Sequence, residues 1–75
     1  MEPRDVALIE GLLPAHSELR DLWEEHLRLD REFQTLGERR FLNRAEEVRR
    51  QELRKAKLAG RDRIEAILRA HRPRP

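Results

Sequence analysis

The chain of 75 residues contains no cysteine and no tyrosine, and only three glycines and three aromatic residues. Without cysteine it has neither disulfides nor thiolate metal sites, which stabilise many chains of this size. No apolar run exceeds four residues, so we expect neither a transmembrane helix nor a signal peptide. These absences predict a cytoplasmic protein that is stabilised by helix packing and self-association.

Helix-forming residues dominate the composition. Ala, Glu, Lys, Leu and Arg make up 47 of the 75 residues, which is typical of long or coiled helices. Two heptad seams with alternating spacings of three and four follow one another along the chain. The first seam is Leu19, Leu22, His26, Leu29, Phe33 and Leu36, and the second is Leu53, Lys57, Gly60, Ile64 and Ile67. The sequence therefore predicts an all-α fold, an antiparallel two-helix coiled-coil hairpin preceded by a short N-terminal helix.

The expected boundaries follow from helix start and stop signals. We expect one domain over residues 1–75, with a short helix at about 3–13, a long helix at about 15–36, a turn at about 37–43, a second long helix at about 44–70 and a frayed tail at 71–75. Ser17 is the expected N-cap of the first long helix. Asn43, followed by Glu46 at the third helical position, resembles a capping box at the start of the second.

The register of the hairpin can be predicted from the centre of the turn. If the turn centres near residue 41, residues whose numbers add up to about 82 face each other, so Leu29 faces Leu53 and Leu22 faces Gly60. A glycine inside a helix costs about 1 kcal/mol relative to alanine. We expect the side chain of Trp23 to lie over Gly60 and fill the gap.

One polar group interrupts the apolar seams. His26 and Asp30 are four residues apart and share a helix face, and Lys57 lies at a seam position of the other helix. We expect a hydrogen-bonded His26–Asp30 pair, with Lys57 completing a polar layer that fixes the register. The alternatives are a metal site and a pH switch centred on His26.

Enzymatic activity finds no support in the motifs. The sequence has no Glu-x-x-His pair, no glycine-rich phosphate loop and no nucleophile motif. We therefore expect no catalytic residues, no cofactor, no resident metal and no small-molecule substrate.

Charge is distributed unevenly along the chain. Residues 1–37 carry a net charge of −5 and residues 38–75 carry +7, although the total is only +2. This asymmetry favours attraction between the two arms of the hairpin. The alternative is that the second helix offers a basic outer face to an acidic partner.

Two segments resemble a known family. Residues 22–30, LWEEHLRLD, resemble the L-F-x-x-H-x-x-L-D signature of the YdcH-like family of small bacterial proteins, and residues 53–64, LRKAKLAGRDRI, resemble its L-K-x-x-K-L-x-L-K-D-x-I segment. The resemblance extends over about residues 5–69 and departs from the family pattern at Trp23 and Gly60. It implies a bacterial helical hairpin and a domain of unknown function.

The function predicted from the sequence is therefore non-enzymatic. We expect a protein-interaction or self-assembly module, with an unidentified protein partner, a homo-oligomer, or both. Its candidate partner surface is the apolar open end of the hairpin, formed by Leu8, Ile9, Leu12, Leu13, Ile67 and Leu68. The alternative for this end is that the short helix merely caps it.

A second candidate function is nonspecific binding of nucleic acid by the arginine-rich second helix. The candidate contacts are Arg49, Arg50, Arg54 and Arg61. Acidic residues interrupt this basic stripe, and the helix has no aromatic residue to stack on bases.

Overall fold

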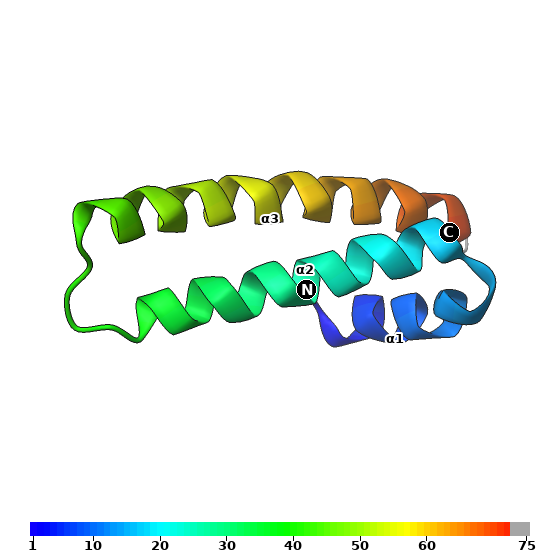
Figure 1. The fold of residues 1–75 in the computed structure, drawn as a ribbon. Helices are drawn as coiled ribbons and strands as arrows, with labels where there is room; N and C mark the ends of the chain where they lie inside the picture. The colour runs from blue at the N-terminus through cyan, green and yellow to red at the C-terminus, as the bar shows by residue number, and fades with distance from the viewer. Residues whose placement is uncertain (73–75) are drawn as a thin grey trace.

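The computed structural model describes residues 1–72, and these residues form an all-α fold (Figure 1). The elements are α1 (Pro3–Leu12), the short 3-10 helix η1 (Leu13–Ala15), α2 (Ser17–Gly37) and α3 (Arg44–His71). The predicted hairpin with a leading helix is thus confirmed. His71 belongs to α3 rather than to a frayed tail, and residues 73–75 of the expected tail lie outside the described residues.

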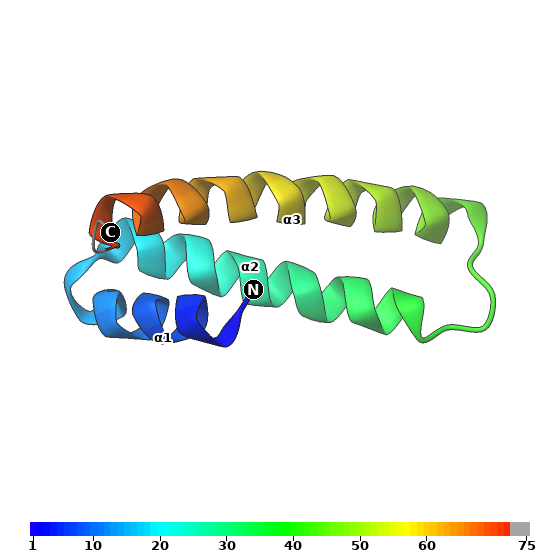
Figure 2. The same cartoon turned by 180° about the vertical axis from the view of Figure 1, so that it is seen from behind.

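The two long helices lie side by side and antiparallel, and α1 runs back along one half of them (Figures 1 and 2). The N-terminus lies near the middle of α2, and α1 extends from there to the end of the hairpin at which α3 finishes. We call this the open end, because no turn joins α2 to α3 there. The half of the hairpin nearer the turn consists of α2 and α3 alone.

The start of α2 differs from the sequence prediction. The N-cap is His16, which has an extended backbone and whose Nδ1 accepts a hydrogen bond from the Leu19 N–H at 3.1 Å. Ser17, the predicted cap, is instead the first helical residue. The His16 ring also packs edge-on against His71, with 5.8 Å between the ring centroids, whereas the sequence suggested no partner for either histidine.

The start of α3 is the predicted capping box. Asn43 Oδ1 accepts from the Glu46 N–H at 2.8 Å, and Glu46 Oε1 accepts from the Asn43 N–H at 3.1 Å. Each side chain thus satisfies a backbone donor that the first turn of the helix would otherwise leave free.

The core consists of two separate clusters. At the open end, Ile9, Leu19, Ile64 and Leu68 are completely buried. Nearer the turn, a smaller cluster joins α2 and α3, and it contains Leu29, Leu36 and Leu53 with Phe33 and Leu42 against them. The predicted pair Leu29 and Leu53 lies in this second cluster, in agreement with the predicted register near the turn.

The apolar open end is capped by α1, which corrects the predicted partner surface. Ile9 and Leu68 have no exposed surface. The other four proposed residues are partly buried and pack against the same cluster; they are Leu8, Leu12, Leu13 and Ile67. Because α1 folds over its own hairpin, these side chains pack on the core of the open end, which favours the alternative that the short helix caps it.

The environment of Gly60 also differs from the prediction. A methyl group added at Gly60 would meet no atom within 4 Å outside its own helix. Trp23 stacks instead on His26, with 5.5 Å between ring centroids and 14° between the ring planes. The predicted filling of the Gly60 gap by Trp23 is therefore wrong, because its indole is held against a neighbour on its own helix.

We therefore expect Gly60→Ala to stabilise the protein. The space at this position is free and alanine has the higher helix propensity, so the free energy of unfolding should rise by about 1 kcal/mol. Urea denaturation at a fixed protein concentration measures this change. A loss of stability would show that a neighbouring group does occupy the space beside Gly60.

The N-cap assignment predicts different effects for two adjacent residues. His16→Ala should lower the free energy of unfolding by about 1 kcal/mol, because it removes the acceptor for the Leu19 N–H. Ser17→Ala should change stability little, since Ser17 makes no capping hydrogen bond. Thermal unfolding of the two variants distinguishes them, and an equal loss in both would contradict the assignment.

Candidate interaction groove

A groove opens between α2 and α3 where α1 begins. It has a volume of about 580 Å³. Its lining residues are His26, Asp30 and Phe33 from α2, Arg54, Lys57, Leu58 and Arg61 from α3, and Met1 at the edge nearest α1. We call this the mid-hairpin groove.

The spacing of these residues explains why they line one surface. On each helix they are three or four positions apart, so their side chains lie on one face. Leu58 and Arg61 also line the crevice beside Glu2 and Asp5 at the flank of α1. The mid-hairpin groove is therefore the continuation, towards the turn, of the surface on which α1 packs.

A salt bridge crosses the floor of the groove. Lys57 Nζ donates to Asp30 Oδ1 at 2.6 Å, and Gln34 donates to the other carboxylate oxygen at 3.0 Å. The hydrogen bond from Lys57 is the main reason that the pKa of Asp30 is lowered. The Lys57 ammonium also lies 4.6 Å from the centroid of the Phe33 ring. Asp30 and Lys57 thus form the predicted polar contact between the two helices.

His26 does not join this polar layer, which corrects the sequence prediction. Its Nδ1 is buried and has no hydrogen-bond partner among residues 1–72. The ring stacks on Trp23 instead, and Asp30 accepts its hydrogen bonds from Lys57 and Gln34. Burial is the largest influence on His26 and lowers its pKa, although the nearby Asp30 carboxylate acts in the opposite direction.

The groove carries excess positive charge. Arg54 and Arg61 are exposed, and neither forms an ion pair with any residue in the described part of the chain. Asp30 is already paired with Lys57. Between these cations lies Leu58, whose surface is 59% exposed. An unpaired cation on each side of an exposed leucine is an arrangement suited to an acidic and partly apolar ligand.

The four arginines proposed for nucleic-acid binding have different environments. Arg49 makes two hydrogen bonds to the Glu32 carboxylate, at 2.5 and 3.1 Å, so its charge is neutralised within the hairpin. The Arg50 guanidinium lies 4.9 Å from the Phe33 ring centroid, beside the groove. Arg54 and Arg61 line the groove itself. Three of the four therefore remain available to a ligand.

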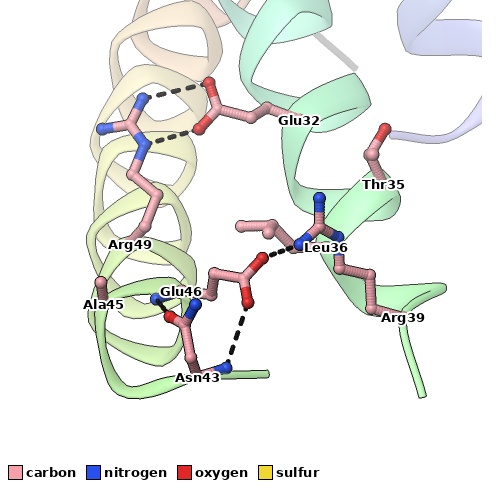
Figure 3. Close-up of a pocket in the computed structure, with 8 residues that line it drawn as sticks. All are labelled: Glu32, Thr35, Leu36, Arg39, Asn43, Ala45, Glu46 and Arg49. Carbon is pink, nitrogen blue, oxygen red and sulfur yellow. Dashed lines mark hydrogen bonds and ion pairs between the residues drawn. The ribbon is translucent and has the colours of Figure 1, made fainter. Parts of the chain in front are cut away.

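A second hollow, near the turn, is occupied by internal contacts (Figure 3). Figure 3 shows Arg49 paired with Glu32, and Arg39 paired with Glu46, which is also bonded to Asn43. Each charged side chain that lines this hollow is thus paired with another one. These pairs hold the turn against α2 and α3. The mid-hairpin groove therefore remains the better candidate site.

Two other kinds of site are absent from the described residues. Between residues 1 and 72, no three His, Asp or Glu side chains lie close enough together to hold a metal ion. None of the helices described is both long enough and apolar enough to cross a membrane.

The groove as a unit was not predicted from the sequence, although most of the residues that line it belong to the predicted seams, polar layer or basic stripe. The available signal was the length of the leading helix, since ten residues cover only half of a helix of 21 residues.

No family model, no curated protein and no solved structure matches the chain.

The buried Nδ1 of His26 predicts a pH-dependent stability. Because the pKa of His26 is lowered in the folded protein, the unfolded chain binds protons more readily just below the ordinary histidine pKa of about 6.5. Stability should therefore fall as the pH decreases through this value. His26→Leu should show a smaller fall, and should be at least as stable as the native chain at neutral pH. Urea denaturation of both proteins at several pH values tests this, and equal pH dependence would contradict it.

Proposed function

We propose that this chain is a non-enzymatic protein-interaction module that binds an acidic helical segment in the mid-hairpin groove. The observation that carries the proposal is that α1 covers only half of the surface between α2 and α3. The uncovered half presents apolar surface together with unpaired cations.

The fold itself contains an example of the proposed mode of binding. At the open end, α1 packs on α2 and α3, and its Ile9 is completely buried beside Leu19 and Ile64. The mid-hairpin groove continues the same surface, so a second helix can pack there in the same way. Amphipathic helices commonly bind to proteins by placing an apolar face in such a groove.

Two kinds of group in the groove have different roles. Phe33 and Leu58 supply apolar surface that a partner helix can cover, which is the main source of affinity. Arg54 and Arg61 supply charge that attracts carboxylates and disfavours basic partners. Exposed charges act mostly on the rate of association and on specificity, so the apolar contacts are needed for a long-lived complex.

We also propose that the chain is related to the YdcH-like family. The likeness of residues 22–30 and 53–64 to the YdcH-like family supports a bacterial, cytoplasmic hairpin protein. The short leading helix α1 and the two long helices α2 and α3 agree with a hairpin fold.

Nonspecific binding of nucleic acid is the second candidate function. It is supported by Arg50, Arg54 and Arg61, which are exposed and have no carboxylate partner in the described part of the chain. Against it, Arg49 is held by Glu32, and Asp30 and Lys57 neutralise each other. We therefore favour the acidic protein segment.

A pair of charge reversals tests the proposed site. In the variant Arg54→Glu/Arg61→Glu the groove loses its excess positive charge. The amount of partner protein that the variant retains from a nuclease-treated cell extract should therefore fall about tenfold. The matched control is Arg63→Glu/Arg69→Glu, which makes the same change in net charge on α3 at positions that do not line the groove. Quantitative mass spectrometry of the retained proteins measures the difference. Equal retention by the two variants would contradict the proposed site.

The same proteins distinguish the second candidate. Binding of a fluorescent duplex DNA and of a single-stranded RNA is measured by anisotropy over a range of salt concentrations. If the native chain binds them and both double variants weaken binding equally, with a steep salt dependence, the basic helix acts on nucleic acid. That result would replace the proposed function.

A further inference from the structure

The uncovered part of the hairpin groove has about the same length as α1. A helix of ten residues is about 15 Å long and one of 21 residues about 32 Å, and these are the lengths of α1 and α2. Because α1 begins near the middle of α2 and runs to the open end (Figure 1), it leaves a length close to its own uncovered.

Because the two lengths agree, two copies of the chain can be related by a two-fold axis through the middle of the hairpin. Such an axis turns the open end of one copy towards the turn of the other. It would place α1 of each copy over the uncovered half of its partner, between the two hairpins. The interface is self-complementary, so every favourable contact occurs twice.

The outward face of α1 is suited to close packing. Arg4, Ala7, Glu10 and Gly11 are all exposed in the single chain. Ala7 and Gly11 are four residues apart; Ala7 has only a methyl side chain and Gly11 has none, and a methyl group added at Gly11 would meet no atom within 4 Å. A second helical surface can therefore approach the backbone of α1 closely.

Charge complementarity supports the same arrangement. Glu2 is paired with Arg4 of the same chain, so the acidic residue left on the outward face of α1 is Glu10. Asp5 is bound by Arg72 of the same chain, whereas Glu10 forms no ion pair with the described residues. The groove supplies Arg54 and Arg61 without partners. The carboxylate of Glu10 thus has the opposite charge to the unpaired groups in the groove.

We infer that the occupant of the mid-hairpin groove is α1 of a second copy, so that two chains form an antiparallel dimer. This inference rests on the proposed function, because it names the helix that the groove binds. A small core is a further reason for dimerisation, since a chain of this length buries only part of its apolar surface alone.

Sedimentation equilibrium of the full chain over a range of concentrations tests the inference. The native chain and the control Arg63→Glu/Arg69→Glu should both be dimers. Glu10→Lys and Arg54→Glu/Arg61→Glu should each raise the dimer dissociation constant about tenfold or more. Combining Glu10→Lys with Arg54→Glu/Arg61→Glu should restore dimerisation, because the charges are then exchanged between α1 and the groove. Circular dichroism confirms that each variant is folded.

Cysteine cross-linking tests the arrangement directly, because the chain has no cysteine of its own. A mixture of the Ala7→Cys and Gln34→Cys proteins should form a mixed disulfide under mild oxidation, since the outward face of α1 lies over α2 of the partner. The control mixture of Ala7→Cys and Ala59→Cys should not, because Ala59 neither lines the groove nor bonds to a residue that does, whereas Gln34 donates to Asp30 of the groove.

A native chain that stays monomeric at all concentrations would overturn the inference. So would a dimer that is unaffected by Glu10→Lys and by the groove variant, since it would use another surface. The proposed function fails separately: it stands if a monomeric chain still retains another protein through Arg54 and Arg61, and it fails if the two double variants retain the same proteins.

Discussion

The burial of one isoleucine governs the architecture of this protein. A two-helix hairpin buries side chains only along the seam where its helices meet, and at the open end that seam needs a further cover. Ile9 supplies it, because it lies on α1 and is completely buried beside Leu19, Ile64 and Leu68. A helix as short as α1 is marginal in isolation, so α1 and the open end depend on each other. The position of α1 in turn determines which half of the hairpin surface stays uncovered.

Ion pairs set the orientation of the helices more than they stabilise them. Arg49 binds Glu32 across the hairpin, and Arg72, the C-cap of α3, binds both Asp5 of α1 and Glu65 of α3. The Arg49–Glu32 pair is exposed, and an exposed pair typically contributes less than about 1 kcal/mol. The effect of these ion pairs is to neutralise much of the opposite charge of the two arms. The cations that remain unpaired include those of the mid-hairpin groove, so the internal pairing also defines the surface that a partner meets.

The sequence predicted the helices and their register well, because heptad spacing directly reports which residues share a seam. Leu29 and Leu53 lie in one core cluster, as the predicted register requires, and Asn43 caps α3 as its type suggests. The errors concern side-chain direction. His26 stacks on Trp23, and Asp30 accepts its hydrogen bond from Lys57 and not from His26. Spacing alone cannot show this, since Trp23 and Asp30 both lie within about one helical turn of His26. The groove was missed for a related reason: it depends on where α1 ends relative to α2, which is a tertiary property.

The ion pair between Arg72 and Asp5 has a consequence for how the chain folds. Arg72 and Asp5 are 67 positions apart, whereas Asp30 and Lys57 are separated by 27. Contacts between distant residues require the ordering of a longer loop, so they form later on average. The hairpin is thus the natural folding nucleus and α1 docks onto it last. The helix that covers the open end is also the part of the molecule that is expected to detach first during partial unfolding.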